Sequence, residues 1–385
     1  MQQIVIKSEI LTKFINLYNL CYLVKPTNGN IYTLKNKLYV LDYGEFNSYT
    51  IEIHQEIKEL NKIAYSTFAN NLYDLFKATR IDNDVLDKSK IEVFINNLLK
   101  EFPVKVYEIY APIWGISLPL GKGQVKIGEF VICRKGVKFV HSDEHQHDHS
   151  INYFLGVSIE ARDDDHVNSL ANEKFSIFES AMRVITKLNG DLSSVTTSEK
   201  RNQYMLRYRK DQSGNTVKND ITSVKFMNEI NLFNEYISNP EFWNIISKPK
   251  SDMDKRMNRA INWLGKALNE ADGHISFIQY FFTIEALLQK DENFGPSITH
   301  RISEITAFLL YEDRIDRLHL YREIKKLYQI RSKIAHGNSI PNILYSQIFN
   351  LREICLDLVK YLLINKDQFQ TYEKLESHIE ELRFG

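Results

Sequence analysis

The sequence contains little cysteine, and its three cysteines, Cys21, Cys133 and Cys355, stand far apart with no CxxC pair. Such scattered thiols argue against a disulfide framework or a thiolate zinc site and indicate a reducing compartment. Charge of one sign is missing as well, because 49 Lys and Arg residues balance 49 Asp and Glu residues. The formal net charge of zero excludes a polybasic protein, so any contact with nucleic acid has to come from local patches.

Long apolar runs are also absent. The most apolar stretch, residues 275–284, is about half the length that crosses a bilayer and runs directly into Glu285. The first residues lack the basic, apolar and small-residue regions of a signal peptide. Neither a phosphate-binding P-loop nor a dinucleotide fingerprint occurs. These absences predict a cytoplasmic protein with no membrane contact and no cofactor.

The chain has 385 residues, of which 43% are hydrophobic and 12% aromatic, and this is enough to form roughly two or three domains. Up to about residue 245 its patterns are mixed. Helical periodicity covers residues 8–23, 51–78, 89–100 and 165–188. A hairpin pattern and strand-like runs cover residues 28–44, 106–120, 124–140, 151–160, 203–210 and 221–227. We therefore expect an α+β region over residues 1–245, with a break between two subdomains near residue 100 as one interpretation.

The later part of the chain reads differently. After the breaks at Pro240 and Pro249, only two more prolines occur, and helical periodicity predominates. It predicts about five helices joined by short loops, over residues 254–271, 275–289, 297–310, 315–336 and 342–363. We expect an all-α helical bundle over residues 246–385, with a domain boundary near residue 245. The whole chain is therefore predicted to belong to the α+β class.

The fourth of these helices carries an arginine on its apolar stripe. The stripe consists of residues at helical spacing, namely Leu320, Ile324, Leu327 and Ile334. Arg331 falls on the same stripe, where a guanidinium is costly unless an anion meets it. Two anions are open at this point: Glu285 on the preceding apolar helix, or a phosphate of a substrate.

His336 follows Arg331 by five residues, and Gly337 after it is a helix terminator. At a helix C-terminus the macrodipole favours the protonated imidazole, which titrates near neutral pH. An arginine and a histidine together offer a cation for a phosphate and an acid or base for a hydroxyl, as cleavage of an RNA backbone requires. Polar neighbours that could support the pair are Ser332, Lys333, Asn338 and Glu285.

The surrounding segments carry a family resemblance. In order along the chain they are RMNRAINWLGKAL at 256–268, FIQYFFTIEALL at 277–288 and LYQIRSKIAHG at 327–337. Together they resemble the HEPN superfamily, whose signature is R-x4-6-H, and in particular the Apea-like HEPN group of bacterial phage-defence proteins. The resemblance covers about residues 251–363.

This resemblance implies a helical bundle that forms a homodimer, in which two R-x4-6-H motifs face each other. It implies a metal-independent endoribonuclease, with Arg331 as the phosphate-binding cation and His336 as the acid/base. Many family members have Asn, Asp or His after the arginine, where this chain has Ser332. The implied role is phage defence by abortive infection, through cleavage of cellular tRNA, mRNA or rRNA. The N-terminal region would then sense a phage-derived trigger or select the RNA. A catalytically inactive HEPN module for dimerisation or RNA binding stays an alternative.

Two further sets of basic residues are candidates for RNA binding. Residues 314–333 hold seven Lys and Arg residues against two acidic residues, and Arg322, Lys325 and Lys326 belong to this excess. In the strand-like run 203–210, Arg207 and Arg209 share one face beside tyrosines on the other. For that run an edge strand with a charged outer face is the competing interpretation.

The segment HSDEHQHDHS, residues 141–150, concentrates histidines. In a strand, His145, His147 and His149 would point the same way, as ligands of a divalent metal do. A polar loop with incidental histidines is the favoured interpretation. A metal-dependent hydrolase that uses the His141–His149 cluster is therefore a third functional alternative.

Overall fold

The computed structural model describes most of the chain. The described residues are 4, 6–23, 25–26, 31–34, 38–40, 42–118, 121–135, 137, 152–189, 195, 197, 206–210, 216–220, 230–231, 239–289, 298–335 and 342–384. For residues 206–210, 216–220 and 230–231 only the backbone is described. Within these ranges the fold is mixed α+β, as expected, and helices predominate. No helix of the described part is long and apolar enough to cross a membrane.

The chain divides into two compact units. The first consists of Met1–Ile109 and Ser158–Glu173, and the second of Tyr110–Val157 and Lys174–Gly385. The chain therefore passes between the units three times, within β4 (Lys105–Ile113), β8 (Tyr153–Ala161) and α5 (Asp164–Leu188). The domain boundary predicted near residue 245 lies inside the second unit and stays a prediction.

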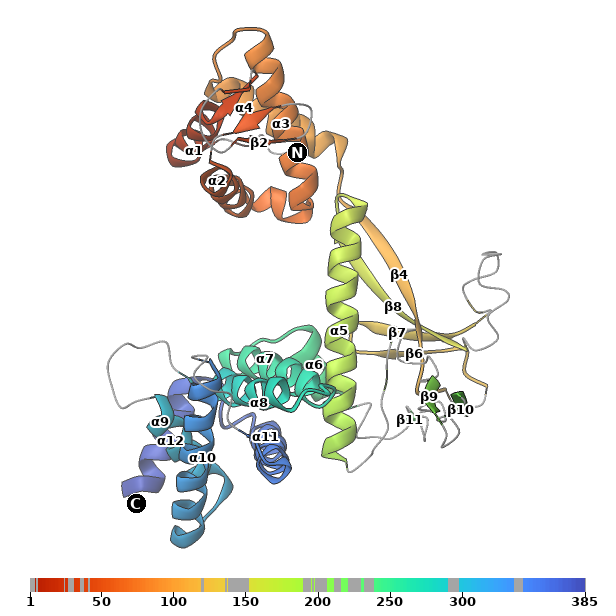
Figure 1. The fold of residues 1–385 in the computed structure, drawn as a ribbon, viewed down its shortest axis with the longest axis vertical. Coiled ribbons are helices and arrows are strands. Elements are labelled where there is room, and N and C mark those ends of the chain that lie inside the picture. The colour runs from red at the N-terminus through yellow and green to blue at the C-terminus, as the bar shows by residue number, and fades with distance from the viewer. Residues whose placement is uncertain are drawn as a thin grey trace. The chain divides into compact units, whose positions relative to one another are not determined.

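Helices form most of the first unit (Figure 1). They are α1 (Ser8–Asn19), α2 (Tyr43–Glu56), the 3₁₀ turn η2 (Lys58–Lys62), α3 (Tyr65–Ile81) and α4 (Lys88–Glu101). A small antiparallel sheet has the order β1 (Cys21–Tyr22), β3 (Tyr39–Val40), β2 (Tyr32–Thr33). Fully buried aromatic residues join the helices in one core, among them Phe14, Phe46, Phe68 and Phe76.

Two predictions for this unit need correction. The hairpin expected over residues 28–44 is present as β2 and β3 but ends earlier, because Asp42 caps α2 by accepting the Glu45 N–H at 2.9 Å. The helical pattern predicted over residues 51–78 is not continuous, because it covers the end of α2, the 3₁₀ turn η2 and most of α3.

Residues 158–173 complete the first unit from a distant part of the sequence. The Asp163 carboxylate accepts the Ala64 N–H at 2.7 Å, and Lys62 lies 2.7 Å from Glu160. Arg162 donates to the carbonyl oxygens of Leu99 and Phe102, which end α4. The segment therefore satisfies polar groups at the start of α3 and the end of α4.

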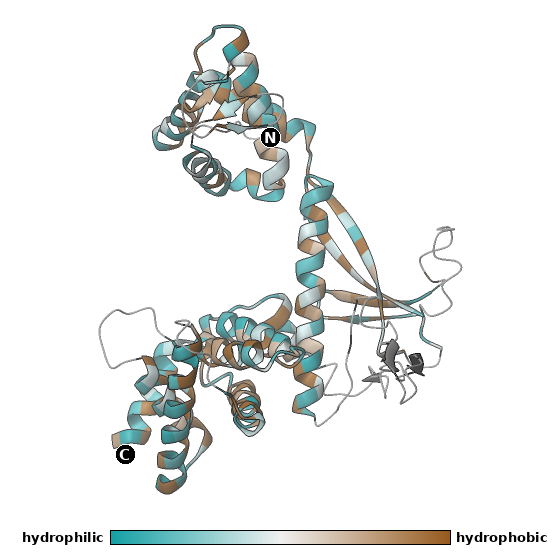
Figure 2. Cartoon of the chain, in the orientation of Figure 1, coloured by the Kyte–Doolittle hydropathy of each residue, from teal (hydrophilic) through white to brown (hydrophobic). Residues whose placement is uncertain are grey.

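A four-stranded sheet has the order β4-β8-β7-β6, with β6 at Gln124–Ile127 and β7 at Phe130–Arg134, and the second unit holds β6, β7 and parts of β4 and β8. Figure 2 shows both hydrophobic and hydrophilic residues in β4 and β8. Four consecutive residues of β8, Phe154–Val157, are buried, so both faces of the sheet are covered along this part of the strand. Helix α5 covers one face: the Phe178 ring lies 4.9 Å from Phe130 and 5.3 Å from Trp243. Two smaller pairs are β5 (Ile116–Ser117) with β11 (Ile230–Asn231), and β9 (Leu206–Lys210) with β10 (Thr216–Asp220). The strand predicted over 221–227 lies outside the described residues.

Residues 240–384 are helical wherever the structure describes them, apart from short connections. The helices are α6 (Pro240–Ser247), α7 (Asp252–Ala267), α8 (Gly273–Leu288), α9 (Ile298–Leu310), α10 (Arg314–Ala335), α11 (Tyr345–Ile364) and α12 (Tyr372–Phe384). Sequence patterns predicted α7 to α11 within a few residues but missed α6 and α12. Pro240 begins a helix here, capped by Asn239, since proline is well tolerated in a first helical turn.

Helix α7 packs along α8, and α8 also contacts α10 and α11. On its other side α7 crosses α5, where Gly265 meets Ser180. A Cβ atom at position 265 would overlap the backbone of Ser180, so this crossing depends on glycine.

We expect Gly265→Ala to destabilise the second unit by about 1–3 kcal/mol, because the backbone of Ser180 cannot yield as a flexible side chain would. All three tryptophans, Trp114, Trp243 and Trp263, belong to this unit, so the midpoint of urea unfolding followed by their fluorescence measures the effect. Gly273→Ala is the matched control, since its Cβ would meet only the terminal methyl of Ile348 at 3.0 Å. Equal midpoints for the two variants would contradict the close crossing.

Candidate active site around Arg331

Helix α10 has two opposite faces. Its inner face consists of the buried Leu320, Ile324 and Leu327, as the apolar stripe predicted. Arg331 continues this face one turn further, with its side chain 22% exposed. The exposed residues Arg322, Lys325, Lys326 and Lys333 lie on other sides of the helix.

Glu285 of α8 is the anion that meets Arg331. The guanidinium Nη2 lies 3.1 Å from Oε1 and 3.2 Å from Oε2 of this carboxylate, whose side chain is only 11% exposed. The Tyr328 hydroxyl donates to the same Oε1 at 2.8 Å. The internal ion pair that the sequence left open is therefore present, and α10 supplies the carboxylate with two donors one turn apart.

Tyr328 is held in its neutral form by its surroundings. Burial raises the pKa of its hydroxyl, and the hydrogen bond to the Glu285 carboxylate raises this pKa further. Its ring stands edge-on to Phe281 of α8, with centroids 5.2 Å apart. The tyrosine therefore keeps its proton and fixes the position of Glu285.

Aromatic rings flank the guanidinium of Arg331. Its Cζ lies 5.5 Å from the Tyr328 ring centroid and 5.8 Å from that of Phe282. Phe282 in turn contacts Trp263 of α7 at 4.8 Å. The buried Nε of Arg331 has no hydrogen-bond partner among the described residues. Because only Nη2 is bonded to Glu285, the guanidinium keeps donors for a second anion such as a phosphate.

The other members of the predicted motif are only partly described. Ser332 is half-buried and Lys333 is exposed, both in the last described turn of α10. His336 and Asn338 lie outside the described residues. The pairing of Arg331 with His336 therefore stays a prediction.

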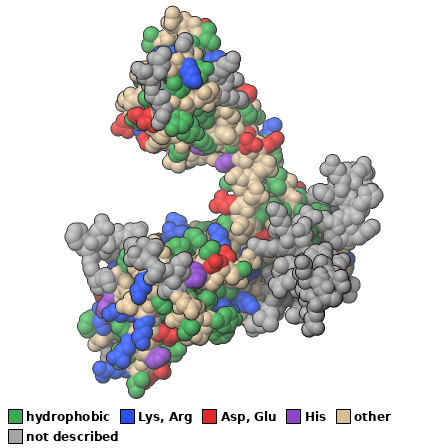
Figure 3. Space-filling model, in the orientation of Figure 1, with side chains coloured by type: hydrophobic (Ala, Val, Ile, Leu, Met, Phe, Trp, Pro, Cys, Tyr) green, Lys and Arg blue, Asp and Glu red, His purple; other side chains and the backbone are tan. Residues whose placement is uncertain are grey.

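The predicted RNA-binding cations do not gather with Arg331. Arg322, Lys325 and Lys326 are exposed away from the inner face of α10, and no described residue forms an ion pair with them. Figure 3 shows Lys and Arg side chains gathered on one side of the C-terminal helices. Arg207 and Arg209 lie in β9, of which only the backbone is described, opposite Asn219 and Val217 of β10.

The residues that could support metal or thiol chemistry are only partly described. His145, His147 and His149 lie outside them. Within the described ranges, no group of three or more His, Cys, Asp or Glu side chains is placed to hold a metal ion. Burial raises the pKa of Cys21 to about 12 and that of Cys355 well above its ordinary value, so neither is a thiolate at neutral pH.

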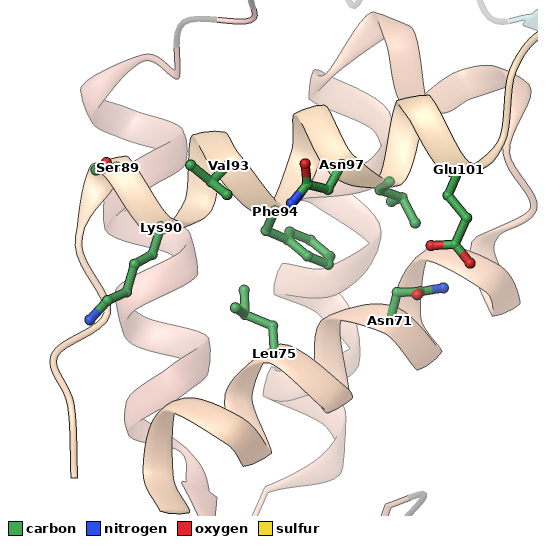
Figure 4. Close-up of a pocket in the computed structure, with 9 residues that line it drawn as sticks. Asn71, Leu75, Ser89, Lys90, Val93, Phe94, Asn97 and Glu101 are labelled. Atoms are coloured by element: carbon green, nitrogen blue, oxygen red, sulfur yellow. The ribbon is translucent and has the colours of Figure 1, made fainter. Parts of the chain in front are cut away.

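A groove of about 380 Å³ lies between α3 and α4 in the first unit (Figure 4). Leu75 and Phe94 lie near its centre, with Lys90 at one end and Glu101 at the other. Lys90 is paired with Asp84 at 2.5 Å, so it is not available as a free cation. The groove therefore brings together no acid, base or nucleophile comparable to the group around Arg331.

Sequence patterns missed two features of the site. Tyr328 was not singled out, although it precedes Arg331 by three residues and such residues are neighbours on a helix. The contact of Trp263 with Phe282 was also missed. The available signal was a tryptophan standing among the polar residues Asn258, Asn262 and Lys266 of α7.

No protein-family model, curated protein or solved structure matches the chain. The group around Arg331 is therefore the candidate for a functional role. It comprises a partly exposed guanidinium with an unbonded donor, a carboxylate that orients it, and two aromatic rings close to it.

We expect Arg331→Met to lower the free energy of unfolding by about 1–3 kcal/mol, because it leaves the Glu285 carboxylate with Tyr328 as its remaining described donor. Glu285→Gln should cost a similar amount. The free energy of unfolding lost in the double variant should be smaller than the sum of the two single losses. The difference, which is the coupling energy of the double-mutant cycle, should be about 0.5–2 kcal/mol. Urea unfolding followed by tryptophan fluorescence measures all four proteins.

The control for this cycle is Arg352→Met with Glu353→Gln, an ion pair of 2.8 Å whose carboxylate side chain is 46% exposed. Its coupling energy should be close to zero. A coupling for Arg331 and Glu285 no larger than that of the control would show that the pair contributes nothing to stability.

Proposed function

We propose that the chain is a metal-independent endoribonuclease of the HEPN type. The observation that carries this proposal is the placement of Arg331, a cation on the inner face of α10 that retains donors for a phosphate. His336 follows Arg331 by five residues in the sequence and lies outside the described residues. Together, the two residue types would supply the chemistry that the R-x4-6-H motif needs.

In the proposed reaction, the 2′-hydroxyl of the substrate attacks the adjacent phosphate. His336 handles the proton, and Arg331 neutralises the charge that builds on the phosphate. Glu285 and Tyr328 position the guanidinium, since the carboxylate binds Nη2 and leaves Nη1, which is not buried, for a phosphate. The products would carry 2′,3′-cyclic phosphate and 5′-hydroxyl ends.

The proposal includes an assembly and a role. Two copies of the chain would form a homodimer through the C-terminal helices and bring two motifs together. The enzyme would cleave cellular tRNA, mRNA or rRNA in the cytoplasm, in defence against phage by abortive infection. The first unit would respond to a phage-derived trigger.

A second candidate is a HEPN module that dimerises or binds RNA without cleaving it. Two observations favour it: Arg331 is already engaged by Glu285, and Ser332 replaces the Asn, Asp or His of many family members. A metal-dependent hydrolase built on His145, His147 and His149 ranks third.

We expect the purified chain to cleave total RNA in excess EDTA and to leave DNA intact, because DNA lacks the 2′-hydroxyl. Arg331→Ala and His336→Ala should each slow cleavage by about 100-fold or more. Mapping of the product ends should give 2′,3′-cyclic phosphate and 5′-hydroxyl groups.

Each other outcome selects a different candidate. Loss of cleavage in EDTA, restored by a divalent ion, would replace this mechanism with the metal-dependent one. If RNA stays intact in every condition, including with phage components added, the remaining candidate is the module that binds RNA without cleaving it.

The exposed cations of α10 provide a separate prediction. Arg322→Gln with Lys326→Gln should weaken RNA binding and reduce the salt slope of the binding constant by about 1.4, as expected for two lost phosphate contacts on a single strand. The rate at saturating RNA should not change, because both residues face away from Arg331. Lys360→Gln with Lys374→Gln is the control, since these lysines are exposed on α11 and α12. A lower rate at saturation would place the α10 cations in the reaction itself.

A further inference from the structure

Helix α7 carries a row of cations on its outer face. Lys255, Arg259 and Lys266 recur at intervals of four and seven residues, so they lie on one side of the helix, opposite the buried Met257, Ala260 and Leu264. Lys255 and Arg259 are exposed, and none of the three forms an ion pair with another described residue. A row of cations without internal carboxylates is suited to an external polyanion.

Two aromatic rings lie beside this row. Trp263 of α7 and Phe282 of α8 are both half-buried, with centroids 4.8 Å apart and planes inclined by 56°. Their neighbours Phe277 and Phe281 on α8 are fully buried. Trp263 and Phe282 therefore retain ring surface that solvent or a ligand can reach.

The aromatic pair also connects the cations to the candidate active site. Lys266 Nζ lies 4.9 Å from the Trp263 ring centroid, and Arg331 Cζ lies 5.8 Å from that of Phe282. One ring contact thus separates a cation of α7 from a cation of α10. The outer cations of α10 lack such a connection, because they point away from Arg331.

We propose that α7 and Phe282 form a track for single-stranded RNA, in which a base stacks against Trp263 and phosphates meet Lys255, Arg259 and Lys266. The track leads the strand to Arg331, and in this respect the inference rests on the proposed function. Aromatic faces between cations are how proteins hold single strands, because every base has a face that stacks. A duplex buries its base faces and offers none to Trp263.

The test measures binding with the full-length chain carrying His336→Ala, so that RNA stays intact. A fluorescein-labelled 12-nucleotide oligouridine, alone or annealed to its complement, is titrated by fluorescence anisotropy. We expect the single strand to bind more tightly than the duplex and to quench tryptophan fluorescence. Trp263→Leu should weaken single-strand binding about 10-fold and remove most of the quenching, within the range known for base stacking.

Two further variants keep this test independent of folding. Trp263→Phe retains an aromatic face and should recover most of the affinity. Lys255→Gln with Arg259→Gln should reduce the salt slope by about 1.4, whereas Lys360→Gln with Lys374→Gln should leave it unchanged. Circular dichroism of each variant confirms that it is folded.

Three results would overturn the track. The first is equal affinity for single strand and duplex, and the second is unchanged RNA binding by Trp263→Leu. The third is that Trp263→Leu loses the dimer in sedimentation but keeps RNA binding, which would assign the two rings to a protein interface. Cleavage by the chain with native His336 is scored separately. If RNA binding depends on Trp263 but no RNA is cleaved, only the proposed function is contradicted. If RNA is cleaved and Trp263→Leu leaves KM unchanged, only the track is contradicted.

Discussion

The ion pair of Arg331 with Glu285 joins α10 to α8 on the inner face of the C-terminal helices. A guanidinium on the inner face of α10 needs an anion, and Glu285 of the largely apolar helix α8 supplies one. Tyr328 gives the carboxylate a second donor, so α8 and α10 are joined by two polar contacts at this point. The same contact aims a cation whose Nε has no partner in the described structure. The same polar group would therefore serve packing and, under the proposed function, hold a phosphate.

Under the proposed function, the two faces of α10 would attract RNA in two ways. Exposed cations such as Arg322 and Lys326 would attract the phosphate backbone without a fixed geometry. Arg331 would bind one phosphate directly, in a position limited by Glu285 and the rings around it. The contact of Trp263 with Phe282 connects the outer face of α7 to Arg331. Capture and positioning would therefore involve different surfaces of the same bundle.

Local pattern predicted most of the C-terminal helices, because their apolar residues repeat over several turns. It missed α12, whose buried residues are only Tyr372, Leu375 and Ile379, and misread Pro240 as a break. At the site it predicted that Arg331 lies inward with Glu285 as one partner, since both occupy strongly patterned helices. The bond from Tyr328 and the contact of Trp263 with Phe282 depend on how α7, α8 and α10 cross, which spacing along one helix does not encode.

The three passages between the units have a consequence for synthesis and for evolution. The first unit is complete only when residues 158–173 have left the ribosome, because Asp163 and Arg162 bind the ends of α3 and α4. By then residues 110–157 of the second unit have already been synthesised, but they cannot pack against the rest of that unit until α5 and the residues after it follow. Because each unit consists of two separated segments, recombination at a single point in the gene cannot exchange either unit. Recombination between related chains would have to replace two separated segments together.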